Sequence, residues 1–138
     1  MAARGEATKQ VIYAPDAVPA LPVFCHAAVD PATGLIFCSG SIGCNDKYQL
    51  PPGGVRAQTA AALDNLAKVL RAAGSTMEQI VKVNVYLTNM QQDFGPMNEV
   101  YAQYFRIVPA RTCVGVATLP LGACVEIECV ALPGGAYY

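Results

Sequence analysis

The sequence predicts an α+β fold in which a single mixed β-sheet carries two helices on one face. Three observations lead to this prediction: short β-branched runs separated by turn residues, two longer segments with apolar residues at helical spacing, and an order of elements that mixes hairpins with crossovers. The length of 138 residues corresponds to one domain. We therefore expect residues 1–138 to form a single domain, with the small and polar residues 1–8 disordered.

The N-terminal part of the chain contains three predicted strands, at residues 9–13, 23–29 and 35–42. The segment 30–34 between the second and third strands has the Asp, Pro and Gly residues typical of a turn, so these two strands should form a hairpin. The third strand contains Ser39-Gly40-Ser41, small residues that let a ligand or another backbone approach closely.

Two segments have the period of an amphipathic helix. The first spans Val55–Ala73 and is followed by Gly74, a residue typical of a helix C-terminus. The second spans Gly95–Arg106, with Pro96 in its first turn, and the polar stretch Thr88–Phe94 before it is interpreted as a loop. Between the helices lies a predicted half-buried strand, in which Val81, Val83, Val85 and Leu87 alternate with Lys82, Asn84 and Tyr86.

The last part of the chain, Pro109 to Leu132, is predicted to be a hairpin that carries charges inside two apolar runs. Arg111 opens the first run, and Glu126 and Glu128 lie in the second. Alternation places both glutamates on the face that the helices leave uncovered. Because the apolar Val114 suits the helix side, Arg111 is expected on the same uncovered face as Glu126.

This arrangement of Arg111 and Glu126 has two interpretations. The two side chains fit a structural ion pair, because an unpaired buried charge is costly. They also fit a site in which Arg111 holds a substrate carboxylate through a bidentate fork. Alternation alone does not choose between these interpretations.

The composition favours a homo-oligomer and argues against a nucleic-acid partner. Hydrophobic residues make up 54% of the chain and charged residues only 14%, so another copy is expected to cover part of the apolar surface. The net charge is −1, and the sequence has no basic run that could follow a phosphate backbone. No apolar run is long enough for a membrane span, and no secretory signal is visible, so we predict a cytoplasmic protein with no membrane partner.

Six cysteines could form disulfides or remain reduced. They are Cys25, Cys38, Cys44, Cys113, Cys124 and Cys129. Most lie in or beside apolar strands, where a free cysteine acts as a small hydrophobic residue, so reduced thiols are the favoured interpretation. There is no CxxC pair, and His26 is the only histidine, so the sequence predicts no metal site.

Several motifs of the chain resemble those of the Rid family, the reactive intermediate deaminases also called YjgF-type or L-PSP endoribonuclease proteins. The C-terminal motif reads Pro109-Ala110-Arg111-Thr112-Cys113, then Glu126-Ile127-Glu128. Similar segments precede it in the family's order: Phe37-Cys38-Ser39-Gly40-Ser41-Ile42-Gly43, Ala62-Leu63-Asp64-Asn65-Leu66 and Val81-Lys82-Val83-Asn84-Val85-Tyr86-Leu87. The resemblance covers residues 9–134.

The resemblance implies a chorismate-mutase-like fold and a homotrimer with three clefts between subunits. It also implies hydrolysis of small enamines and imines that carry a carboxylate, such as 2-aminoacrylate, to 2-keto acids and ammonia, without a cofactor. In this chain Arg111 would bind the substrate carboxylate, and Glu126 would activate the attacking water as a general base. Glu128 would have a structural role.

The resemblance further implies which residues line the pocket: Ser39, Gly40, Asn98, Cys113 and Phe24. Cys113 would form the pocket wall rather than act as a nucleophile. Phe24 is the best match to a tyrosine that the family places in its pocket, and Ser41 stands where the family has glutamine. Because Phe24 lacks the phenol hydroxyl, the pocket is expected to prefer a more apolar or a specialised substrate. His26 is interpreted as a hydrogen-bonded core or interface residue rather than a catalytic one.

Two other function classes remain open at this point. The chain could form a trimer that binds a small carboxylate without turning it over. It could also be a ribonuclease or translation inhibitor, as the family's older label implies, although the absence of a basic patch argues against this.

Overall fold

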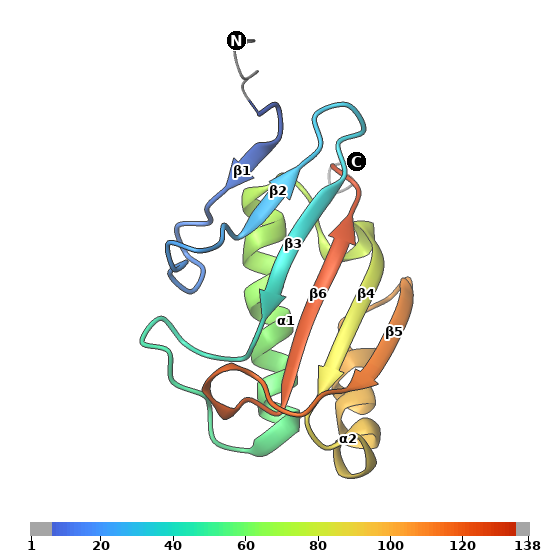
Figure 1. Cartoon of the computed structure of the whole chain (residues 1–138). Coiled ribbons are helices and arrows are strands. Elements are labelled where there is room, and N and C mark those ends of the chain that lie inside the picture. Colours follow the sequence, from blue (N-terminus) through green and yellow to red (C-terminus); the bar gives the residue numbers. More distant parts are fainter. Residues whose placement is uncertain (1–6, 135–138) are drawn as a thin grey trace.

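The structure is a computed structural model, and it describes residues 7–134. One six-stranded sheet with the strand order β1-β2-β3-β6-β4-β5 forms a single layer, and both helices lie on the same face of it (Figure 1). The elements are β1 (Gln10–Ile12), β2 (Ala27–Val29), β3 (Ile36–Ser41), α1 (Gly54–Ala72), the 3₁₀ turn η1 (Met77–Gln79), β4 (Ile80–Leu87), α2 (Met90–Ala102), β5 (Ala110–Gly115), the 3₁₀ turn η2 (Pro120–Gly122) and β6 (Val125–Ala131). The sheet is mixed, because β4 and β5 are parallel while the other pairs are antiparallel. The predicted fold class is therefore confirmed. The disorder expected for residues 1–8 concerns a segment of which residues 1–6 lie outside the described part.

The predicted hairpin at the N-terminal side is present as β2 and β3. The Asp30 carboxylate accepts hydrogen bonds from the Ala32 backbone N–H and the Thr33 hydroxyl, which closes the turn. Gly34 follows with φ 78°, a conformation that glycine adopts most easily. Only residues 27–29 of the predicted strand 23–29 are extended and paired, so the segment between β1 and β2 is longer and more irregular than expected.

Helix α1 lies within one residue of its predicted bounds, whereas the prediction for α2 was wrong at both ends. The stretch interpreted as a loop forms the first turn of α2, because the Asn89 side chain accepts a hydrogen bond from the Gln92 backbone N–H and caps the helix. Pro96 therefore lies inside the helix rather than in its first turn. The helix still continues through it, since Met97 and Tyr101 on the next turns are buried against the sheet.

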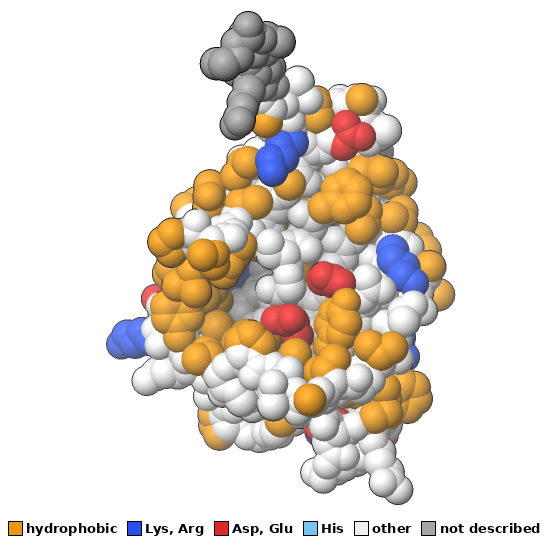
Figure 2. All heavy atoms as spheres, in the orientation of Figure 1, with side chains coloured by type: hydrophobic (Ala, Val, Ile, Leu, Met, Phe, Trp, Pro, Cys, Tyr) orange, Lys and Arg blue, Asp and Glu red, His pale blue; other side chains and the backbone are white. Residues whose placement is uncertain are grey.

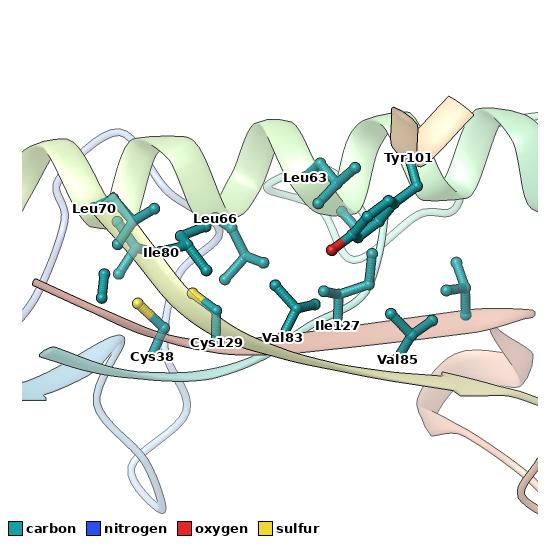
Figure 3. Close-up of a cluster of buried hydrophobic side chains, with 14 of the residues drawn as sticks. Cys38, Leu63, Leu66, Leu70, Ile80, Val83, Val85, Tyr101, Ile127 and Cys129 are labelled. Carbon is teal, nitrogen blue, oxygen red and sulfur yellow. The ribbon is translucent and has the colours of Figure 1, made fainter. Parts of the chain in front are cut away.

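The hydrophobic core lies between the sheet and the helices (Figure 3). Leu63, Leu66 and Leu70 of α1 face Val83 and Val85 of β4 and Ile127 of β6. The prediction for the start of β4 needs a correction, because a bulge between Ile80 and Lys82 changes the alternation. Ile80 is buried as a result, and Val81, predicted to face the core, is 39% exposed.

The predicted hairpin Pro109–Leu132 does not exist, because β4 lies between β5 and β6 in the sheet. β5 pairs with β4 in parallel, and β6 pairs with β4 and β3 antiparallel. Residues 116–124 therefore cross past the end of β4 before they enter β6. The prediction assumed that two consecutive strand-like runs pair with each other, as they usually do. Here β4 pairs with both of them instead, with β5 on one side and β6 on the other.

Candidate active site

Glu126 points to the open face of the sheet, as the sequence predicted. In β6 Val125, Ile127 and Cys129 are buried against the helices, so Glu126 and Glu128 point away from them. A Cβ atom on Gly40 would lie 2.9 Å from the Glu126 Cδ atom. The absence of a side chain at Gly40 therefore creates the space that the Glu126 carboxylate occupies.

A pocket of about 640 Å³ opens beside these two glutamates. Its wall is formed by the segment before β2, the end of β3, α1 and the η2 turn. The predicted residues Phe24, Ser39, Gly40 and Glu126 all line it. Figure 2 shows acidic side chains in the middle of this face, bordered by hydrophobic side chains. The structure thus brings four of the seven predicted site residues together.

Burial raises the pKa of the Glu126 carboxyl above its usual value, and the nearby negative charge of Glu128 raises it further. The structure shows no hydrogen-bond donor or cation bound to Glu126 among residues 7–134. A carboxylate that is partly desolvated and unpaired is a better proton acceptor than one on the open surface. This is the property that a general base requires near neutral pH.

Glu128 is held differently from Glu126. Its Oε1 atom accepts a hydrogen bond of 2.5 Å from the Tyr86 hydroxyl and one of 3.2 Å from the Asn84 side-chain amide. Both donors come from β4, whose residues lie directly opposite β6 in the sheet. The hydrogen bond from Tyr86 to Glu128, together with burial, raises the pKa of the Tyr86 hydroxyl.

His26 and Ser39 have structural hydrogen bonds in the pocket wall. His26 Nδ1 accepts a hydrogen bond from the Ala14 backbone N–H, so Nε2 carries the proton and donates to the Val18 carbonyl. The Ser39 hydroxyl donates to the Cys25 carbonyl at 2.6 Å. The Ser39 contact attaches the segment before β2 to β3, and the two His26 contacts hold that segment together. They agree with the interpretation of His26 as a hydrogen-bonded, non-catalytic residue.

Arg111 does not lie on the same face as Glu126, which corrects the prediction from alternation. In the parallel pair of strands Arg111 is opposite Val83 and Cys113 is opposite Val85, and both partners face the core. Val114, which was expected on the helix side, is 40% exposed on the open side. The prediction failed because it assumed that the apolar Val114 must pack against the helices of the same chain, which placed Arg111 on the other face.

The guanidinium of Arg111 is oriented by helix α2. It donates a hydrogen bond of 2.7 Å from Nη1 to the Asn98 side-chain oxygen, and it lies over the Tyr101 ring with Cζ 4.7 Å from the ring centroid. The Phe94 ring is 5.9 Å away. Among the described residues no carboxylate forms a salt bridge with Arg111. An oriented guanidinium without an anion is suited to bind the carboxylate of a ligand.

The remaining predicted residues, Asn98 and Cys113, lie with Arg111 rather than in the pocket. Cys113 is two residues from Arg111 on the same side of β5, and it packs against the core. Burial raises the pKa of its thiol, and the charge of Arg111 offsets part of that shift. A raised thiol pKa disfavours the reactive thiolate and is consistent with a wall position for Cys113.

Sequence reasoning missed four residues of these two groups. Tyr86 was assigned only to the outer face of β4, and Leu121, which lines the pocket with φ 60°, was not singled out within the predicted hairpin. Phe94 was placed in a loop, and Tyr101 was not distinguished from the other residues of the second predicted helix. Only the cap at Asn89 could have indicated that Phe94 belongs to the helix beside Arg111.

All six cysteines are free thiols, as predicted. Within residues 7–134 there is no group of three or more His, Cys, Asp or Glu side chains placed to hold a metal ion. In the same part of the chain, none of the helices has the length and apolar character needed to cross a membrane.

Comparison with known families identifies the chain. The family model described as Endoribonuclease L-PSP matches residues 15–133. The chain belongs to this family. The mouse 2-iminobutanoate/2-iminopropanoate deaminase is 45% identical to this L-PSP family protein over 101 residues, which are 72% of this chain and 74% of the mouse protein. The mitochondrial protein mmf2 of Schizosaccharomyces pombe is 47% identical over 102 residues, or 71% of this chain and 79% of the yeast protein.

Solved structures lead to the same assignment. The Rid family protein YyfA from Yersinia pestis is 37% identical, with a TM-score of 0.84 over 90% of this chain and 98% of that protein. The predicted Rid family and its α+β fold are therefore confirmed. The names of the curated relatives also support the predicted activity, imine deamination. Cytoplasmic localisation stays a prediction, because relatives of this L-PSP protein include one named mitochondrial.

Proposed function

We propose that this protein hydrolyses imines of small 2-keto acids at clefts between copies of the chain, with Arg111 from one copy and Glu126 from the next. The observation that carries the proposal is that these two side chains lie on opposite faces of one sheet. A single chain therefore cannot present both to one small substrate. A second copy that places its β5 and α2 against the pocket would complete the site.

The exposed surface supports such an assembly. The open face of the sheet carries large apolar side chains, among them Phe37 at 49% exposed and Val114 at 40% exposed. A face with exposed aromatic and β-branched residues is typical of a surface that another copy covers. We propose a homotrimer with three equivalent sites, as the family resemblance implies.

The two groups of residues have complementary chemical roles. Arg111 binds the substrate carboxylate, which fixes the imine carbon beside the pocket. Glu126 accepts a proton from a water molecule as the water oxygen bonds to the imine carbon. Glu126 passes this proton to the nitrogen, which gives a carbinolamine. Transfer of the second water proton from the new hydroxyl group to the nitrogen then accompanies cleavage of the carbon–nitrogen bond, and the products are a 2-keto acid and ammonia. Imines hydrolyse readily in water, so positioning of substrate and water can provide most of the acceleration.

The pocket also suggests which side chain the substrate carries. Val18, Leu66 and Val69 form apolar parts of its wall. Phe24 adds an aromatic ring without a hydroxyl group. We therefore expect a higher kcat/KM for imines derived from leucine or methionine than for the imine derived from alanine.

An assay with imines formed in situ tests both the activity and this preference. An amino-acid oxidase generates each imine, and semicarbazide traps the fraction that is not hydrolysed. The protein should lower the amount trapped in proportion to its concentration. Unchanged trapping for every amino acid would contradict the deaminase function, and equal rates for alanine and leucine would contradict the preference.

A complementation experiment tests the position of the site between copies. Arg111→Ala and Glu126→Gln variants should each be inactive, but mixed oligomers contain clefts with both native residues. Random mixing of equal amounts should restore about one quarter of the wild-type activity, because each site needs two independent native contributions. No recovery in oligomers shown by mass spectrometry to be mixed would place both residues in one chain's site.

The two alternative functions have distinct outcomes in these experiments. A trimer that only binds carboxylates would be stabilised by 2-keto acids, but it would leave the trapping of imines unchanged. A ribonuclease is not favoured, because the pocket contains two glutamates, and the residues that line it include no lysine or arginine. The ribonuclease interpretation would be supported only if the wild-type protein cleaves RNA and the Glu126→Gln variant does not.

A further inference from the structure

The pair Glu126 and Glu128 combines two carboxylates with unequal environments. They are two residues apart on one face of β6 and both line the pocket. Glu128 receives hydrogen bonds from Tyr86 and Asn84, whereas Glu126 receives none from the described residues. When a fixed, hydrogen-bonded carboxylate lies beside an unpaired one, the two groups influence each other's proton affinity.

Within one chain, the other ionisable groups around Glu126 do not cancel this effect. Arg111 of the neighbouring copy, which the proposed function places at the same cleft, is present in every variant compared below. Tyr86 of β4 is directly opposite Glu126 in the sheet, and its hydroxyl donates a hydrogen bond to Glu128. From β3 the neighbours are Gly40 and Ser39, which are neutral. The segments that close the pocket contribute three ionisable side chains that line it: His26, Cys44 and Tyr48. His26 is bonded on both ring nitrogens as a neutral ring, burial raises the pKa of the Cys44 thiol, and the Tyr48 hydroxyl donates to the Pro19 carbonyl.

We propose that Glu128 is a positioning residue for the deamination reaction: Tyr86 and Asn84 fix its carboxylate beside Glu126, and this neighbour makes Glu126 a stronger base. This inference rests on the proposed function. The charge of Glu128 disfavours a second negative charge on Glu126, so Glu126 takes up a proton from the attacking water more readily. Glu126 must then pass that proton to the departing nitrogen. The substrate becomes more negative when the water oxygen bonds to it, and this change in charge drives the transfer. Glu128 itself does not need to contact the substrate.

The test follows the titration of Glu126 directly. Protein labelled with ¹³C at glutamate side-chain carboxyls is titrated by NMR without substrate, as wild type and as Glu128→Gln, Glu128→Asp and Tyr86→Phe variants. Glu78→Gln is the control, because it removes one carboxylate that forms a salt bridge with Arg106 on the exposed surface. The acidic limb of the kcat profile is measured for the same set.

We expect Glu126 to titrate at lower pH in Glu128→Gln, and the acidic limb of kcat to move to lower pH with it. Glu128→Asp, which retains the charge, and Glu78→Gln should titrate as the wild type does. Tyr86→Phe should shift Glu126 less than Glu128→Gln does, because the charge remains while one of its two donors is lost. A purely structural role for Glu128 would change stability without moving the titration of Glu126.

Unchanged titration of Glu126 in a folded Glu128→Gln protein would overturn the proposal, and so would an equal shift in Glu78→Gln. If Glu128→Gln does not fold, an unshifted Glu126 in Tyr86→Phe would also overturn it. A shift in NMR without any imine hydrolysis by the wild type would support the coupling of the two carboxylates while it refutes the proposed function. The two failures are therefore distinguishable.

Discussion

Replacing Arg111 with alanine is expected to lower kcat/KM for imine hydrolysis by roughly 100- to 1,000-fold, which corresponds to about 3–4 kcal/mol of lost binding to the substrate carboxylate. The guanidinium is already oriented by Asn98 and by the Tyr101 ring, so little ordering accompanies substrate binding. Most of the loss should appear as a higher KM. Steady-state kinetics with the leucine-derived imine measures it.

Two further variants separate the fork of Arg111 from its charge. Arg111→Lys keeps the positive charge but loses the bidentate geometry and the stacking on Tyr101, so it should recover only a small part of the activity. Arg106→Ala removes an exposed arginine that pairs with Glu78, and it should leave KM unchanged. Full activity of Arg111→Ala would refute the role of Arg111 as the carboxylate clamp.

Replacing Glu126 with glutamine is expected to lower kcat by about 100- to 10,000-fold, the usual contribution of a general base. Glutamine has nearly the same shape and can lie over Gly40 as the glutamate does, so ligand binding should be retained. Measuring kcat for the wild type and the variant tests the loss of activity, and measuring the Kd of a 2-keto acid product for both proteins tests whether binding is retained. Glu99→Gln, which changes a surface carboxylate paired with Arg56, is the matched control.

The same substitution should stabilise the protein at neutral pH. Because the pKa of Glu126 is raised in the folded state, the free energy of unfolding of the wild type is higher below the usual glutamate value of 4.5 and decreases as pH rises through the folded-state pKa. Glutamine does not ionise, so Glu126→Gln avoids this decrease. Urea unfolding should show the variant to be more stable than wild type at pH 7, with the difference absent at pH 4.

A variant that is less stable than wild type at pH 7 and equally stable at pH 4 would reverse the sign of the expected effect. It would mean that the Glu126 carboxylate has a favourable charged partner in the assembled protein. The kinetic and stability results together therefore distinguish a base kept unpaired for catalysis from the structural ion pair that the sequence alone left open.

The amino-acid sequence determined the features that depend on local patterns. The helical period of Val55–Ala73 predicted α1 within one residue, and the alternation in β6 predicted that Glu126 and Glu128 face away from the core. The motifs around Ser39-Gly40 and Arg111 indicated the family and the residue types of the site. These signals are local because helix and strand periodicity depend only on which face of an element is buried.

Only the tertiary structure decided which of these residues meet. The insertion of β4 between β5 and β6, and the register that sets Arg111 opposite Val83, separate Arg111 from Glu126 on opposite faces of the sheet. The exposed Val114 led to the wrong face for Arg111, because an apolar surface that stays exposed on the chain has the same alternation as one that packs against a helix. Sequence patterns record that a face is apolar, and not what covers it.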